Sequence, residues 1–289
     1  MAGWAARRLA KKGSVLMPTI VVTSDLHLGI TGKYQLQALV EDISAIQPDL
    51  TILAGDIGEG LANFVACLGL FSGVPGVVGV LAGNHDIWAR HGYASQDLWE
   101  CRLPEAVRSA GMLWLEDTVW RLDGLAVVGS LAWYDYSAAA RKGCSLEFYA
   151  TNKARYNADG LYINWQWEDA EFARQLGDQV VARLDQIEHE AAVRSCLVAT
   201  HVPLVEEQIT RRPWDKRWTV GNAYFGNLTL GRRVLQYRKV EAIISGHTHV
   251  GRQGRAARPH FPDLAPVSVA VVPSDYNKPR FVTVELAPS

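Results

Sequence analysis

The sequence predicts an α/β fold with a largely parallel sheet, and three observations support that class. From residue 19 onward, short runs rich in β-branched residues alternate with segments whose apolar residues recur at helical spacing. This alternation is typical of parallel strands joined by crossover helices. The 289 residues are 48% hydrophobic with a formal net charge of −1, an ordinary globular composition. Third, no apolar stretch approaches the ~20 residues of a membrane span.

The first half of the chain predicts three strands with helices between them. The strands are β-branched and apolar runs, and the helical segments carry apolar residues three or four positions apart. The first helix is expected to stop before Pro48, and the third is expected to be interrupted at Pro104. In order, the predicted elements are strand 19–24, helix 34–46, strand 50–54, helix 61–71, strand 77–82 and helix 95–110.

The second half predicts a hairpin, a long amphipathic helix and further strands. Asp123-Gly124 between two β runs is a strong hairpin signal. In order, the elements are strands 118–122 and 125–129, helix 169–193, strand 195–200, helix 232–238, and strands 242–245, 267–272 and 280–286.

The domain organisation is predicted to be one domain over residues 17–289. Within it, the irregular, aromatic-rich residues 133–168 are predicted to be an insertion or a cap. Residues 1–16 contain four basic residues, no acid and too short an apolar core for a secretory signal. We predict a loosely ordered extension there, with an organelle transit peptide as the alternative.

Five predicted strands are followed directly by residue types that bind metals or transfer protons. In a parallel sheet such groups gather beyond the carboxyl ends of the strands. Asp25 and His27 are two residues apart, as are His247 and His249, and in extended chain such pairs face the same side. The glycines within the motifs permit tight turns and close backbone approach. The motifs are Asp25-Leu26-His27, Gly55-Asp56, Gly83-Asn84-His85-Asp86, His201 and Gly246-His247-Thr248-His249.

Together these motifs resemble the signature of the calcineurin-like metallophosphoesterases, over residues 19–250. The resemblance implies a four-layer αββα sandwich of two mixed sheets with a dinuclear metal site at the strand ends. It implies two ligand sets that share Asp56 as the bridge. The first set is Asp25, His27, Asp56 and His249, and the second is Asp56, Asn84, His201 and His247. Mixed nitrogen and oxygen ligands favour two divalent transition metal ions, namely Mn, Fe, Zn or Co, over Mg²⁺ or Ca²⁺.

We therefore predict a metal-dependent enzyme that hydrolyses a phosphodiester or a phosphomonoester by means of a metal-bridging hydroxide. His85 is expected beside the substrate, where it would protonate the leaving alkoxide.

Two alternatives are a Ser/Thr protein phosphatase and a non-catalytic scaffold of the same fold. In the phosphatase pattern the Gly-Asp motif continues with two residues and then Asp-Arg-Gly. Here Gly55-Asp56 continues Ile-Gly-Glu-Gly, so the arginine that grips phosphate is absent from the motif. The complete set of ligands together with His85 argues against the scaffold.

The loop after His201 interleaves basic and aromatic residues, and we predict that Arg211, Arg212 and Asn222 bind substrate. A solvated loop is the alternative.

Lys and Arg number 29 against 30 Asp and Glu, which gives no strong nucleic-acid signal. Four dispersed cysteines without a CxxC pair favour a reducing cytoplasm. The expected partner is a small phosphorylated substrate, with no membrane and with the oligomeric state left open.

Overall fold

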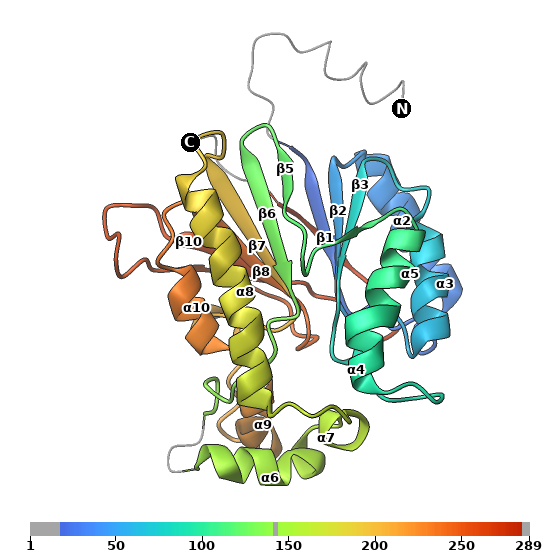
Figure 1. The fold of residues 1–289 in the computed structure, drawn as a ribbon, viewed down its shortest axis with the longest axis vertical. Coiled ribbons are helices and arrows are strands. Elements are labelled where there is room, and N and C mark those ends of the chain that lie inside the picture. Colours follow the sequence, from blue (N-terminus) through green and yellow to red (C-terminus); the bar gives the residue numbers. More distant parts are fainter. Residues whose placement is uncertain (1–17, 141–143, 285–289) are drawn as a thin grey trace.

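Two β-sheets form the centre of the computed structural model, which describes residues 18–140 and 144–284 (Figure 1). The strands of the first sheet are β1 (Ile20–Thr23), β2 (Leu50–Ala54), β3 (Val77–Leu81), β4 (Leu113–Trp114) and β11 (Phe281–Val284). Their order is β11-β1-β2-β3-β4, with β11 antiparallel at one edge and the other strands parallel.

The second sheet has six strands in the order β5-β6-β7-β8-β10-β9. They are β5 (Trp120–Leu122), β6 (Leu125–Ser130), β7 (Ser195–Thr200), β8 (Val240–Ser245), β9 (Arg252–Ala256) and β10 (Val267–Val271). The four central strands are parallel, and β5 and β9 are antiparallel edge strands. Both sheets are therefore mixed.

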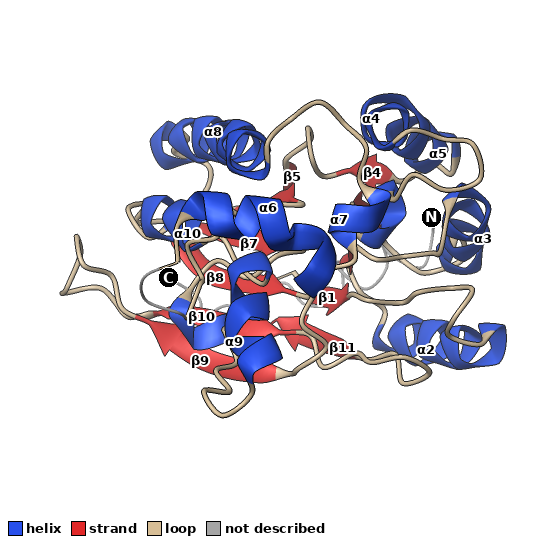
Figure 2. Cartoon of the chain, turned by 90° about the horizontal axis from the view of Figure 1, so that it is seen from below, coloured by secondary structure: helices blue, strands red, loops and turns tan. Residues whose placement is uncertain are grey.

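Helices cover the outer face of each sheet (Figures 1 and 2). On the first sheet these are α2 (Lys33–Ile46), α3 (Leu61–Phe71), α4 (Ser95–Asp97) and α5 (Leu103–Ser109), and on the second they are α8 (Asp169–His189) and α10 (Leu228–Val234). Three further helices gather below the carboxyl ends of the strands in Figure 1: α6 (Leu146–Tyr156), α7 (Asp159–Tyr162) and α9 (Lys216–Gly221).

The apolar core confirms the four-layer arrangement that the resemblance implied. Along β1, Ile20 and Val22 pack between the two sheets, whereas Val21 packs on the helical side. This is the period of two expected for a strand that is buried on both faces. A third apolar cluster joins the outer face of the second sheet to α8 and α10. The layers are thus helices, sheet, sheet and helices.

Several element predictions need correction. The interruption predicted within helix 95–110 is present just before Pro104, which lies in the first turn of α5. A π-helical turn, Leu98–Arg102, joins α4 to α5. The helix predicted at 232–238 is α10, which starts earlier because Asn227 caps it by accepting from the Leu230 amide. The helix predicted over 169–193 is α8, which ends at His189. The structure also contains elements that the sequence did not predict, namely β4, β9, α6, α7 and α9.

The segment 133–168, predicted to be irregular, contains α6 and α7 and lies beneath the strand ends (Figure 1). Its aromatic side chains Trp133, Tyr134 and Tyr149 are fully buried.

The predicted N-terminal extension, residues 1–16, lies outside the described residues. Across the described part of the chain, we find no helix with the length and apolar character needed to span a bilayer.

Glu116, just after β4, is a buried carboxyl group in this fold. It accepts hydrogen bonds from the backbone amides of Leu131, at 2.8 Å, and Ala82, at 3.1 Å. Burial raises the pKa of Glu116 from 4.5 to about 7. The native state therefore favours the protonated carboxyl, and this contribution to stability is complete below pH 4.5 and lost as the pH rises through 7.

We expect Glu116→Gln, which cannot ionise, to weaken the pH dependence of stability. Between pH 4.5 and 8 the variant should lose less free energy of unfolding than the wild type, by a difference on the order of 3 kcal/mol. Urea unfolding at both pH values measures this difference. The exposed Glu105→Gln on α5 is the matched control, and an identical pH dependence in wild type and Glu116→Gln would contradict the prediction.

Candidate metal centre

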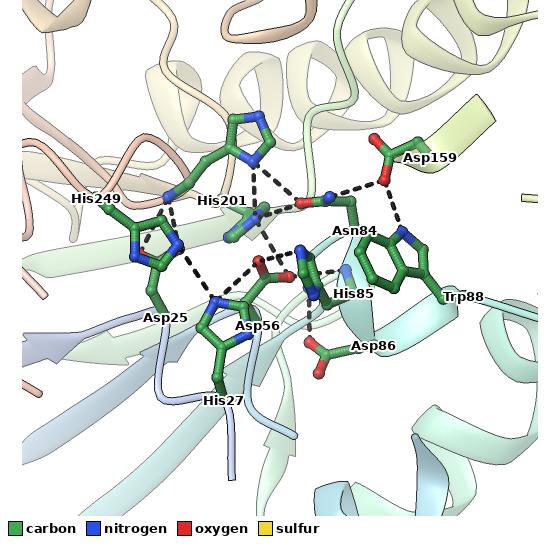
Figure 3. Close-up of polar contacts among 12 residues, drawn as sticks. Asp25, His27, Asp56, Asn84, His85, Asp86, Trp88, Asp159, His201 and His249 are labelled. Carbon is green, nitrogen blue, oxygen red and sulfur yellow. Dashed lines mark hydrogen bonds and ion pairs between the residues drawn. The ribbon is translucent and has the colours of Figure 1, made fainter. Parts of the chain in front are cut away.

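The carboxyl ends of β1, β2 and β3 in one sheet and of β7 and β8 in the other meet at one site (Figure 3). All seven predicted ligands lie there, together with His85. Most are buried, with relative exposures of 0% for Asp25, His27 and His201 and 4% for Asn84. The structure therefore brings together side chains from positions more than 200 residues apart in the chain.

The backbone at these strand ends is left-handed. Positive φ angles occur at Asp25 (55°), His27 (45°), Asp56 (52°), His247 (74°) and His249 (54°). The expectation of extended backbone between paired ligands is therefore wrong, although both members of each pair do reach the site. Such φ values are unfavourable for residues with a Cβ, at roughly 1–3 kcal/mol each, so neighbouring contacts must stabilise these turns.

Asp86 and Gly83 provide such contacts around the Asp56 turn. The buried Asp86 carboxylate accepts from the backbone amides of Ile57, Gly58 and Gly83 at 2.8–3.2 Å. A Cβ on Gly83 would lie 2.1 Å from Asp56 Oδ1, so only glycine fits there. The predicted close backbone approach at this glycine is confirmed.

The first group of ligand atoms comes from Asp25, His27, Asp56 and His249. His27 Nε2 lies 3.5 Å from Asp56 Oδ2 and 3.3 Å from His249 Nε2. His249 Nε2 lies 3.6 Å from Asp25 Oδ1. Four candidate ligand atoms from three different loops therefore face a common point.

The second group comes from Asp56, Asn84, His201 and His247. His201 Nε2 lies 3.4 Å from Asp56 Oδ1, 3.0 Å from Asn84 Oδ1 and 3.2 Å from His247 Nδ1. The two carboxylate oxygens of Asp56 thus face different groups of ligands. This is the arrangement expected of a residue that bridges two ions.

These distances fit metal coordination, because ligands bound at about 2.0–2.2 Å from one ion lie about 3.0–3.5 Å from each other. Hydrogen bonds also orient three of the imidazole rings for metal coordination. His27 Nδ1 faces Glu59 Oε1 at 3.0 Å, His201 Nδ1 faces the Ala54 carbonyl at 2.9 Å, and His247 Nε2 faces the Tyr224 carbonyl at 2.9 Å. An N–H on each of these atoms leaves the other ring nitrogen free to bind a cation.

The charge of the site also attracts cations. Burial lowers the pKa of His201, but the negative charge of Asp56 outweighs burial and raises it to about 9. The buried carboxylates therefore favour positive charge at this point. The His and Asp clusters fit a dinuclear divalent metal site.

Glu59 is a functional candidate that sequence reasoning treated only as a departure from the protein phosphatase motif. Its Oε1 accepts from His27 Nδ1 at 3.0 Å and from His85 Nδ1 at 2.8 Å. Burial opposes its ionisation, yet these two hydrogen bonds lower the pKa of Glu59 to about 2. One carboxylate therefore orients both a candidate metal ligand, His27, and His85.

His85 lies beside the ligands rather than at the end of a strand. Asn84 is helical and His85 begins a 3₁₀ turn (His85–Ile87), so strand alternation does not explain how the ring is aimed. Its Nε2 lies 4.0 Å from Asp56 Oδ2. Trp88 stacks on the His85 ring, with centroids 3.6 Å apart. The ring is held on one side by Trp88 and at Nδ1 by Glu59.

Asp159, in α7, connects the 133–168 segment to the candidate metal ligand Asn84 (Figure 3). The side chain is fully buried. Its Oδ1 accepts from Asn84 Nδ2 at 2.8 Å and from Trp88 Nε1 at 2.6 Å, and its Oδ2 accepts from Tyr134 Oη at 2.8 Å. Because Asn84 Nδ2 is held by Asp159, Asn84 Oδ1 is directed toward His201 and His247.

We expect Asp159→Ala to weaken one metal ion selectively, because Asn84 would lose the contact that orients its carbonyl oxygen. Loss of such a supporting contact typically lowers metal affinity by about 10–100-fold. At a free-metal concentration that just saturates the wild type, the metal content of the variant should fall from two ions per chain toward one. Tyr134→Phe, which removes only the third contact of Asp159, is the matched control. Two ions retained at wild-type affinity in Asp159→Ala would contradict this role.

The predicted substrate-binding residues Arg211, Arg212 and Asn222 are also brought together, since all three line one cavity of about 370 Å³. Two further side chains near the site were not predicted. Arg90 pairs with Glu59 at 2.5 Å, and the Tyr276 ring lies 4.8–4.9 Å from the rings of His249 and His27. Nothing in their local sequence marks either residue.

Comparison with known proteins gives a match to a family model described as calcineurin-like phosphoesterase, over residues 18–251. No curated protein matches the sequence. Among solved structures, the chain is similar to a phosphopantetheinyl hydrolase from Mycobacterium tuberculosis, with 21% identity and a TM-score of 0.69 over 94% of this chain and 99% of that one. It is also similar to a dimetal phosphatase from Danio rerio, with 15% identity and a TM-score of 0.56 over 92% of each chain. At these identities the similarity shows a shared fold.

Proposed function

Because the chain belongs to the calcineurin-like phosphoesterase family, we propose that it is a metal-dependent hydrolase of a phosphodiester or phosphomonoester in a small molecule. One observation carries this proposal: two groups of ligand atoms share Asp56, and His85 lies beside them. Their mixed nitrogen and oxygen donors favour Mn, Fe, Zn or Co, with manganese as the first ion to test.

The chain's own residues supply binding, orientation and a proton. When bound, two divalent ions would activate water as the nucleophile and neutralise charge on the phosphate. Burial lowers the pKa of His85, but Asp56 and Glu59 outweigh burial and raise it above its ordinary value. With Nδ1 donating to Glu59, Nε2 is the atom that can donate a proton to the leaving-group oxygen.

Arg90 supplies a cationic side chain that the Asp56 motif lacks, and it contacts the same carboxylate, Glu59, as His85 does. The Arg90 guanidinium carbon lies 4.4 Å from the Trp88 ring centroid and 4.5 Å from that of Tyr162. One of its nitrogens pairs with Glu59, and the side chain is 27% exposed. Since its other N–H groups can still donate, we assign Arg90 the binding of a phosphoryl oxygen that does not leave.

The activity is tested by removing metal with a chelator and then adding Mn²⁺, Zn²⁺, Fe²⁺, Co²⁺ or Mg²⁺. Hydrolysis of bis(4-nitrophenyl) phosphate, a diester, is compared with that of 4-nitrophenyl phosphate, a monoester. We expect no turnover in the chelated protein and recovery with a transition metal. Absence of metal-stimulated hydrolysis with both substrates would favour the non-catalytic scaffold.

The natural substrate and location require separate tests. A phosphopantetheinyl ester belongs in the substrate panel, because the Mycobacterium tuberculosis protein of similar fold is named a hydrolase of that group. The four cysteines are free, which supports a reducing compartment. We propose the cytoplasm, to be checked by cell fractionation.

A further inference from the structure

A cavity of about 370 Å³ lies between the loop after β7 and the beginning of the 133–168 segment. Its lining consists of Ala139, Ala140, Arg211, Arg212, Pro213, Thr219 and Asn222. The side chains of the two alanines are small and apolar, so the specificity of binding in this cavity depends on its polar side chains.

The two arginines differ in what they contact. Arg211 is engaged in an ion pair with both carboxylate oxygens of Glu206, at 2.6 and 2.7 Å, and also donates to the Ala138 carbonyl. The Arg212 guanidinium carbon instead lies over the Trp218 ring, 3.9 Å from the ring centroid. Among the residues that the structure describes, no carboxylate pairs with Arg212. Because stacking uses the face of the guanidinium, its N–H edge can still bind an anion.

Asn222 provides an unsatisfied acceptor. The residue is fully buried, and its Nδ2 donates to the Thr210 carbonyl at 3.1 Å. This bond fixes the orientation of the amide, because a flipped side chain would place two oxygens against each other. Its Oδ1 is buried and has no hydrogen-bond partner among the described residues. A buried oxygen of this kind is unfavourable unless a ligand donates to it.

The cavity adjoins the metal centre. Asn222 begins a 3₁₀ turn (Asn222–Tyr224), and the Tyr224 carbonyl accepts from His247 Nε2 at 2.9 Å. A 3₁₀ helix rises about 2 Å per residue, so Asn222 lies roughly 4 Å along the turn from Tyr224. Tyr224 is the residue whose carbonyl holds the candidate ligand His247. Figure 1 shows α9, which leads into this turn, below the carboxyl ends of the strands.

We propose that this cavity is a subsite for an acidic arm of the substrate that also carries a hydrogen-bond donor, such as an amide N–H close to a carboxylate or phosphate. Arg212 binds the anionic group, and Asn222 Oδ1 accepts from the N–H. This assignment rests on the proposed phosphoesterase activity and narrows its substrate class.

The test compares three phosphodiesters with the same 4-nitrophenolate leaving group. Within each set of three, the second arms have the same length, and sets are prepared at several lengths. The first arm ends in an N-acylglycine, the second in the corresponding O-acyl glycolate, which lacks the N–H, and the third in an N-propyl amide, which lacks the charge. The N-acylglycine arm should give a KM about 10-fold lower than either of the others. The O-acyl glycolate loses a hydrogen bond to a buried oxygen, and the N-propyl amide loses a charge-assisted hydrogen bond to Arg212. Equal KM values for the three arms would overturn the subsite.

Variants separate the subsite from general effects. Arg212→Met should raise the KM of the N-acylglycine arm by about 10-fold and remove its advantage over the N-propyl amide. Arg217→Met removes an exposed charge from α9 that does not line the cavity, and it should leave all three KM values unchanged.

Binding distinguishes failure of the subsite from failure of the proposed function. Hydrolysis of bis(4-nitrophenyl) phosphate, which has neither group, reports the phosphoesterase activity alone. Calorimetry with the phosphate monoester of the N-acylglycine arm, on Mn²⁺-loaded protein, tests the subsite even without turnover. We expect about 10-fold weaker binding in Arg212→Met, and equal affinity in wild type and variant would overturn the proposal.

Discussion

Asp56→Asn is expected to weaken both metal ions and to abolish most of the activity, whereas His27→Ala should weaken mainly one. Asp56 Oδ2 faces His27 and Oδ1 faces His201, and Asp56 is the one residue that the predicted ligand sets share. The asparagine side chain has one carbonyl oxygen and one NH₂ group, and the NH₂ group would face an imidazole nitrogen in one of the two groups of ligands. Loss of this ligand should lower the affinity for both ions by about 100-fold or more, since even supporting contacts are worth 10–100-fold.

Metal content and binding affinity measured on the purified variants distinguish the two cases. Asp97→Asn, the same chemical change at a partly exposed ion pair with Arg102, is the matched control and should keep both ions. Wild-type stoichiometry in Asp56→Asn with activity intact would refute the bridging assignment. Equal losses in Asp56→Asn and His27→Ala would mean that the two groups of ligands act as one site.

The ligands could be predicted from the sequence because each motif directly follows a strand that is apolar enough to be recognised. TIVVTS before Asp25 and SCLVAT before His201 are such strands. Parallel pairing gathers the strand ends within each sheet, and the packing of the two sheets brings the end of β1 next to the end of β7. The prediction did not need the correct backbone geometry. It assumed extended pairs, whereas Asp25 and His27 have left-handed φ values that come from the turn itself.

The supporting residues could not be predicted, because their roles depend on tertiary contacts rather than on local pattern. Asp159 lies in a segment with no strong helical period, 75 residues from the Asn84 that it orients. Arg90 and Tyr276 likewise act through neighbours that are distant in the chain. Only Glu59 had a usable local signal, its position three residues after Asp56. A carboxylate at that spacing reaches back to both His27 and His85.

Replacement of His85 is expected to separate chemistry from metal binding. Its Nε2 lies 4.0 Å from Asp56 Oδ2, and its Nδ1 is hydrogen-bonded to Glu59 at 2.8 Å. Asparagine in its place retains an amide that can donate to Glu59 but cannot deliver a proton. His85→Asn should therefore keep both ions and the fold, while turnover falls by roughly 10²–10⁴-fold, the usual contribution of general acid catalysis.

The size of that loss should depend on the leaving group. Nitrophenolate is a weak base that leaves without protonation, so the deficit of His85→Asn should be small for nitrophenyl esters. An alkoxide leaving group needs the proton from His85 Nε2, so the deficit should be largest for alkyl esters. The measurement is kcat for both kinds of ester in wild type and variant, with metal content determined on the same samples. A deficit that is the same for both would mean that His85 acts by stabilising phosphoryl oxygens, and wild-type kcat for alkyl esters would exclude it from catalysis.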